Sequence, residues 1–162
     1  MKKFILLFTL LVSGIFFSQF TVSDSSDNWE KIGNAYAHTI LYQKKDKTSA
    51  KIEYRDFQSL TLLTPSAMNL NYYEFKFSTD ENTLDKIYQI FKDHFASKKE
   101  ETITLDFPEG KMLLEFGKSL GSYYCNFKFD KANTLLDKGD TSIRSSGAMK
   151  EKQLDKLFGK TK

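Results

Sequence analysis

Apolar and polar side chains alternate along several stretches of this chain, and the alternation limits its fold more than any other feature. Tyr73, Phe75 and Phe77 alternate with polar or exposed positions, and five further segments show the same period of two. Such a period places every second side chain on one face of a β-strand. The pattern predicts strands at 35–43, 50–57, 71–77, 102–107, 112–116 and 122–129, and a shorter one at 59–63.

Two other segments follow the spacing of a helix. The first has one apolar stripe, which predicts a helix to about Ser97, made by Leu84, Ile87, Tyr88, Phe91 and Phe95. Ser78 and Glu81 fit a capping box at its start. A second helix is expected near the end of the chain, capped by Ser145 or Ser146 and ended by Gly159, with the apolar residues Met149, Leu154, Leu157 and Phe158.

The order of these elements indicates the fold class. Short turns at 108–110 and 117–121 join the later strands, and turns of that length connect antiparallel neighbours. We therefore expect an α+β fold with a single, mostly antiparallel sheet of about six strands. The main helix would pack on one face, and the second helix would lie at the C-terminus. Periodicity is lost between Asp130 and Ser146, which predicts a long loop.

The first 18 residues have the character of a secretory signal peptide. Lys2 and Lys3 precede an apolar run from Phe4 to Phe17. A membrane-spanning helix needs roughly 20 apolar residues, so we expect a signal cleaved after Ser18 or Ser23 rather than an anchor. The signal resembles those of exported proteins of Bacteroidota-type bacteria. The sequence thus predicts a periplasmic or extracellular protein that meets the membrane only during export, with a lead-in at 19–34 and one domain at 35–162.

Charge and cysteine content narrow the classes of partner. Without its first 18 residues the chain has 22 basic and 21 acidic residues, a net charge of +1. A near-neutral chain with scattered lysines gives no reason to expect nucleic acid as a partner. Because Cys125 is the only cysteine, no internal disulfide can form, and stability must come from packing.

Few residues are candidates for chemistry. Cys125 has an apolar-phase position between two aromatic residues, which predicts a buried and unreactive thiol. His38 lies in a predicted strand and His94 near the end of the main helix. No pair of residues has the local spacing of a metal site, and no motif indicates a cofactor. His38 and Cys125 are therefore considered first as anchors for a ligand, and Cys125 as a nucleophile only in the least favoured hypothesis below.

A contact surface is the more informative candidate. Tyr72, Tyr124 and Leu113 should lie on the sheet face opposite the main helix, and Leu41 or Tyr42 could join them. Apolar and aromatic patches of this kind mark surfaces for partners. The alternative, which we favour at this point, is that the C-terminal helix or the long loop covers that face.

Three hypotheses for function follow, in order of preference. The first is an exported, non-catalytic binding domain of a bacterial envelope, with an unknown partner at the outer sheet face and the 130–146 loop. The second is a carrier for a small apolar ligand held between the sheet and the main helix, anchored by His38 or Cys125. The third is a small hydrolase that uses Cys125 and a histidine.

Overall fold

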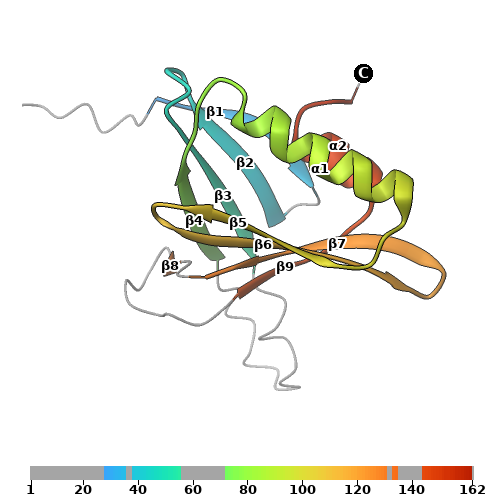
Figure 1. The fold of residues 1–162 in the computed structure, drawn as a ribbon. Helices are drawn as coiled ribbons and strands as arrows, with labels where there is room; N and C mark the ends of the chain where they lie inside the picture. The colour runs from blue at the N-terminus through green and yellow to red at the C-terminus, as the bar shows by residue number, and fades with distance from the viewer. Residues whose placement is uncertain (1–27, 36–37, 56–71, 131–132, 135–143, 162) are drawn as a thin grey trace, which may run out of the picture.

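The computed structural model describes residues 28–35, 38–55, 72–130, 133–134 and 144–161. Within these ranges the chain has an α+β fold with two antiparallel sheets and two helices (Figure 1). Sheet A has the strand order β1 (Trp29–Ala35), β2 (Thr39–Lys44), β3 (Ser49–Arg55), β4 (Tyr72–Ser78) and, at its edge, the two-residue β8 (Asn133–Thr134). Sheet B has the order β5 (Thr102–Phe107), β6 (Gly110–Ser119), β7 (Ser122–Phe129) and β9 (Arg144–Met149). The helices are α1 (Thr83–Ser97) and α2 (Glu151–Leu157).

The expected single sheet is therefore corrected to two sheets whose apolar faces meet. Phe129 of β7 lies between Tyr54 of β3, with ring centroids 4.5 Å apart, and Phe75 of β4, at 5.0 Å. Phe77 of β4 contacts Phe107 of β5 at 4.7 Å. A period of two shows which side chains share a face, but it does not show which strands pair. The strands before α1 form sheet A, whereas β5, β6, β7 and β9 form sheet B, and only the short β8 returns to pair with β4.

The two helices complete the core on the side where the sheets diverge. Phe91 of α1 stacks on Phe127 at 5.3 Å between centroids and packs on Phe116 at 6.0 Å, so α1 covers the apolar face of sheet B. Phe158, which follows α2, contacts Phe91 at 5.4 Å. Figure 1 shows α2 beside α1, and α2 packs against β1. The C-terminal helix thus lies on the inner side, and the expectation that it covers an outer sheet face is wrong. The alternative that the 130–146 loop covers that face falls mostly outside the described residues.

The first helix begins differently from the expected capping box. The Ser78 hydroxyl donates to the Glu109 carboxylate instead of capping the helix. Asp80 accepts hydrogen bonds from the Asn82 amide at 2.8 Å and from the Thr83 hydroxyl at 2.7 Å. The predicted end at Ser97 is confirmed, and Lys98 closes the helix in the left-handed conformation with φ 55°.

Several element boundaries also differ from expectation. β1 lies inside the segment that we expected to be a lead-in, and β2 starts at Thr39. Ser145 and Ser146 belong to β9 rather than to a helix cap, and Gln153 instead accepts a hydrogen bond from the Lys150 amide at 2.6 Å at the start of α2. The predicted signal, the strand at 59–63 and part of the 130–146 loop lie outside the described residues. Among the described helices, none has the length and apolar character needed to cross a bilayer.

Candidate functional site

The structure separates the four predicted surface residues onto two faces. Tyr42 and Tyr72 lie on the outer face of sheet A, because their neighbours in sequence point into the core. Leu113 and Tyr124 lie on the outer face of sheet B for the same reason. Since the inner faces of the two sheets meet, the two outer faces point away from each other. The four residues therefore do not form one patch.

The outer face of sheet B is closed by contacts within the sheet. The Tyr124 ring lies over Gly117, where an added Cβ would be only 3.0 Å from the tyrosine oxygen. Beside it, Glu115 accepts hydrogen bonds from Lys128 at 3.0 Å and from Asn126 at 3.2 Å. The Lys128 hydrogen bond is the main cause that holds the pKa of Glu115 below its ordinary value. The outward side chains of β6 and β7 thus contact one another, whereas those of β5 are exposed.

On the outer face of sheet A, lysine side chains gather around Trp29, the only tryptophan of the chain. The ammonium groups of Lys51, Lys76 and Lys44 lie 5.3, 5.5 and 5.7 Å from the Trp29 ring centroid. Lys51 also lies 5.2 Å from the ring of Tyr42. These five residues, which we call the Trp29 cluster, come from four strands. Cation–π contacts of this kind contribute about 0.5–1 kcal/mol each at exposed sites.

The strand register explains how the cluster forms. Trp29 pairs with Lys44 across β1 and β2, and Tyr42 pairs with Lys51 across β2 and β3. Lys51 in turn pairs with Lys76 across β3 and β4. Directly opposed side chains in an antiparallel sheet are close neighbours. The sheet therefore gathers three lysines, distant in sequence, around one indole ring.

Two carboxylates balance part of this charge. Lys51 forms ion pairs with Glu53 at 2.8 Å and with Glu74 at 2.9 Å. Burial alone would lower the pKa of Lys51, but the hydrogen bonds to both carboxylates outweigh it and the pKa is raised. Burial is also the main cause that raises the pKa of Tyr42, and the Glu53 carboxylate adds to the shift. Both groups keep their protons, and the Lys51 ammonium stays positive, at neutral pH.

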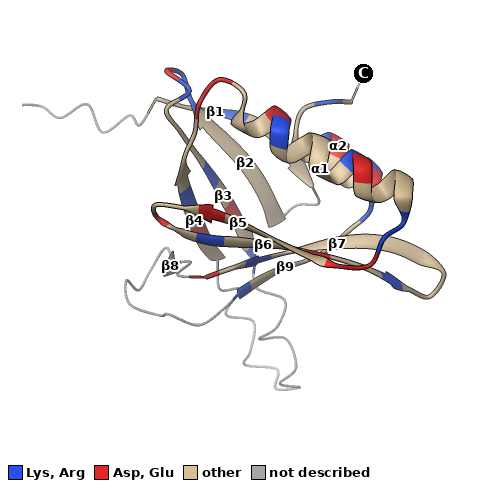
Figure 2. Ribbon diagram, viewed as in Figure 1, with Lys and Arg blue, Asp and Glu red and all other residues tan. Residues whose placement is uncertain are grey.

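The face as a whole is positively charged. Its two acids, Glu53 and Glu74, are outnumbered by five bases, which gives a net charge of +3; the bases are Lys31, Lys44, Lys51, Arg55 and Lys76. Glu109 borders the face, where it accepts the hydrogen bond from Ser78, and including it leaves +2. The chain after its first 18 residues carries only +1. Basic residues along β3 and β4 are visible in Figure 2.

The arrangement of charge on this face is unfavourable for stability by itself. Lys51 stands directly opposite Lys76, and Glu53 stands directly opposite Glu74. Like charges in directly opposed positions destabilise an antiparallel pair. The ion pairs of Lys51 with both carboxylates counteract these repulsions, and Lys44 and Lys76 form no ion pair with any other described residue.

The two candidate ligand anchors lie far from each other in the fold. His38 is next to β2 on sheet A, where its Nδ1 lies 3.4 Å from the Tyr72 hydroxyl. Tyr72 itself is 36% exposed. Cys125 is fully buried on the inner face of β7, and burial raises the pKa of its thiol well above the ordinary value. His38 and Cys125 therefore do not belong to one binding site.

The second histidine, His94, is held in place by contacts with its neighbours. His94 Nδ1 lies 2.7 Å from the Ile90 carbonyl oxygen, and its Nε2 lies 2.8 Å from Glu101. Its ring stacks on Phe116 at 4.4 Å between centroids. In the described ranges, no three residues of the types His, Cys, Asp and Glu are gathered as metal ligands.

Sequence reasoning missed Trp29 and therefore the centre of the site. The pairing of β1 with β2 shifts register between Lys31 and Gly33, and this bulge interrupts the alternation that identified the other strands. The segment from Trp29 to Ala35 has no regular alternation that could have identified β1 from the sequence. Comparisons with models of protein families, with curated proteins and with solved structures find no match.

Proposed function

We propose that this chain is an exported, non-catalytic binding domain of a bacterial envelope that holds an acidic protein partner on the outer face of sheet A. The observation that carries the proposal is the convergence of three lysine ammonium groups on the ring of Trp29. Tryptophan and tyrosine are enriched at the centres of protein interfaces. The Trp29 cluster has both, surrounded by positive charge.

Charge complementarity supports an acidic partner. The net +3 of this face would attract acidic side chains and would speed their encounter at low salt. Lys44 and Lys76 make no ion pair with another described residue, so a partner's carboxylates can pair with them without breaking an existing ion pair. The aromatic rings would then supply apolar contact beside these ion pairs.

The contacts inside the core favour this surface over the carrier hypothesis. A ligand between sheet and helix would need the space that the Phe91, Phe116 and Phe127 rings fill with direct contacts. The hydrolase hypothesis is disfavoured by the buried Cys125 thiol, whose raised pKa keeps it protonated at neutral pH. The signal-peptide character of residues 1–18 supports export, and export to the bacterial envelope is part of what we propose.

The test compares two charge-reversed variants of the mature chain. Lys44→Glu with Lys76→Glu alters the Trp29 cluster, whereas Lys111→Glu with Lys118→Glu makes the same change in charge on exposed lysines of sheet B. Each protein is offered a tryptophan-free polyglutamate peptide and then an envelope extract of its own host, with chemical cross-linking. Because Trp29 is the only tryptophan, its emission reports on this face directly.

The expected result is saturable binding that changes the Trp29 emission, weakens with salt and drops by about tenfold or more when the two cluster lysines are reversed. The sheet B variant should bind as the unaltered chain does. Cross-links to one acidic protein should map to sheet A. Equal binding by the two variants, or cross-links confined to sheet B, would contradict the proposal.

A further inference from the structure

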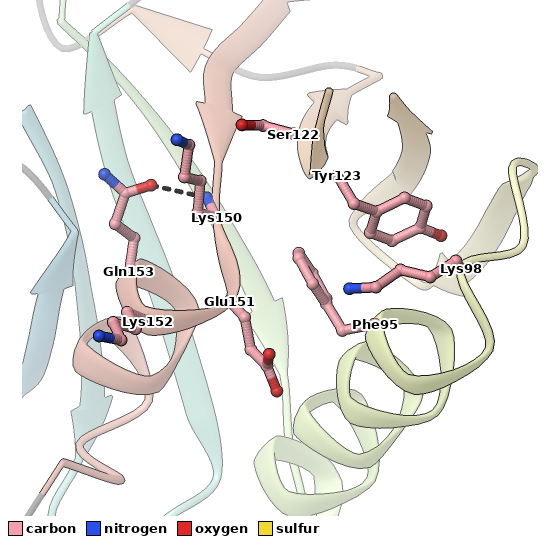
Figure 3. Close-up of a pocket in the computed structure, with 8 residues that line it drawn as sticks. All are labelled: Phe95, Lys98, Ser122, Tyr123, Lys150, Glu151, Lys152 and Gln153. Carbon is pink, nitrogen blue, oxygen red and sulfur yellow. Dashed lines mark hydrogen bonds between the residues drawn. The ribbon is translucent and has the colours of Figure 1, made fainter. Parts of the chain in front are cut away.

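A pocket of about 410 Å³ lies where three distant parts of the chain meet, away from the outer face of sheet A. It is formed by the end of α1, the first residues of β7 and the first residues of α2, as Figure 3 shows. Sites for small molecules are commonly of about 300–1,000 Å³. The lining residues are Phe95, Lys98, Ser122, Tyr123 and the segment from Lys150 to Gln153.

Two aromatic rings give the pocket an apolar floor. Phe95 is 3% exposed and Tyr123 is 9% exposed, and their rings meet edge to face with centroids 5.1 Å apart. The Tyr123 hydroxyl donates a hydrogen bond to the Lys99 carbonyl, so the polar end of this side chain is already bound. Burial is the main cause that raises the pKa of Tyr123 to about 12, which keeps the ring neutral. The two rings therefore present a small surface to the pocket, and this surface is apolar.

A single ammonium group is held above that floor. Lys98 Nζ lies 4.9 Å from the centroid of the Tyr123 ring and 5.3 Å from that of Phe95. In Figure 3 the Lys98 side chain extends between these rings toward the α2 segment. The backbone fixes the position from which the Lys98 side chain starts. Lys98 is the left-handed residue that closes α1, and its amide donates a hydrogen bond to the His94 carbonyl at 2.8 Å.

The remaining charges leave the pocket positive. Lys150 and Lys152 lie on the opposite side of the lining, and in Figure 3 their side chains point away from Phe95 and Tyr123. The only acid of the lining, Glu151, forms an ion pair with Lys92 of α1. Three lysines and one carboxylate give the lining a net charge of +2. An anion that enters the pocket would meet Lys98 without competition from Glu151.

We propose that this pocket binds a small carboxylate with an aromatic or short aliphatic body, its carboxylate on Lys98 and its apolar body against Phe95 and Tyr123. A neutral molecule of the same shape would gain the apolar contact but not the ion pair, and a purely inorganic anion would gain the ion pair alone. This site is separate from the Trp29 cluster, so the proposal does not depend on the protein partner proposed for sheet A.

The test uses 2-naphthoate as the probe and its neutral analogue 2-naphthylmethanol as the comparison, with the mature chain in solution. We expect saturable binding of the acid by calorimetry, about tenfold or more tighter than that of the alcohol. Amide chemical shifts should change at 95–98, 122–123 and 150–153 and not around Trp29 or Lys76. Failure of the acid to bind saturably, equal affinities of acid and alcohol, or shifts elsewhere would overturn the proposal.

Variants then assign the carboxylate contact. Lys98→Gln keeps a side chain of similar length and should weaken 2-naphthoate about tenfold, whereas Lys98→Arg should retain most of the affinity. Lys111→Gln, on the outer face of sheet B, is the matched control and should bind as before. Unchanged binding by a folded Lys98→Gln protein would overturn the assignment. Should that variant not fold, the comparison of acid with alcohol and the shift map decide the question.

Discussion

At the scale of single residues, the tip of the β6–β7 hairpin contains a side chain that its backbone does not favour. Leu120 has φ 47° and Gly121 has φ 76°, so both central residues of this two-residue turn are left-handed. Turns of this type favour asparagine followed by glycine, because a branched or bulky side chain is strained at positive φ. Leu120 is also fully exposed and gains nothing from burial.

We therefore expect Leu120→Asn to stabilise the protein by about 1 kcal/mol. The measurement is the free energy of unfolding from urea denaturation. Leu120→Ala serves as the control, since it removes the exposed apolar group but leaves a non-glycine residue at positive φ, and it should have little effect. An equal gain in both variants would show that the exposed leucine, and not its backbone conformation, was the source of the strain.

At the scale of whole elements, the close approach of β1 to α2 sets the position of the strand that contains Trp29. A Cβ added at Gly33 would lie 2.0 Å from the Lys156 carbonyl oxygen and 2.6 Å from that of Leu157. Both are backbone atoms at the end of α2, so no side chain can move aside. A residue without a Cβ is thus required where the bulge of β1 meets the helix.

Gly33→Ala should destabilise the protein by at least about 2 kcal/mol, because α2 or β1 must shift to make room. Gly117→Ala is the matched comparison, since its Cβ would meet the movable end of the Tyr124 side chain, and its loss should be smaller. Urea denaturation followed by Trp29 emission measures both. Equal losses in the two variants, or no loss at Gly33, would mean that this contact does not hold β1 against the helix.

The elements that could be predicted from sequence are those whose pattern is local. The strands β3 to β7 and the first helix were identified because their alternation, and the apolar stripe from Leu84 to Phe95, can be recognised within a short segment of chain. β1 was missed because the bulge near Gly33 interrupts the alternation of its side chains. β9 was missed because Met149 is its one large apolar residue. Elements with an irregular pattern need their neighbours to define them.

At the scale of the molecule, no local pattern in the sequence showed which distant strands pair with each other. The period of two placed Tyr72 on an outer face and left Leu41 or Tyr42 as its neighbour, and the structure buries Leu41 and leaves Tyr42 outside. Leu113 and Tyr124 were placed beside Tyr72 because one sheet was assumed. The Trp29 cluster depends on the register of four strands, and no local pattern brings Lys44, Lys51 and Lys76 to one ring. The site was therefore mispredicted for the same reason as the sheet, because the pairing of distant strands was not known.

Phe129 is one of the aromatic residues that connect the two sheets, and it has the shortest ring contact between them. Phe129 of sheet B contacts Tyr54 and Phe75 of sheet A as well as Phe127 of its own strand, with centroids 4.5, 5.0 and 6.1 Å apart. All four belong to one buried cluster that also includes residues of both helices. Loss of this ring should therefore weaken both sheets together and not sheet B alone.

Phe129→Leu keeps the site apolar and should lower the free energy of unfolding by about 1–2 kcal/mol, whereas Phe129→Ala should lose about 3–5 kcal/mol. Trp29 emission follows sheet A, since this is the only tryptophan, and hydrogen exchange of amides in β6 and β7 follows sheet B. In the leucine variant both probes should report the same reduced stability, because the two apolar faces lose the same contact. A lower stability in sheet B with Trp29 emission unchanged would mean that the sheets unfold separately, and that the surface around Trp29 does not depend on the core behind it.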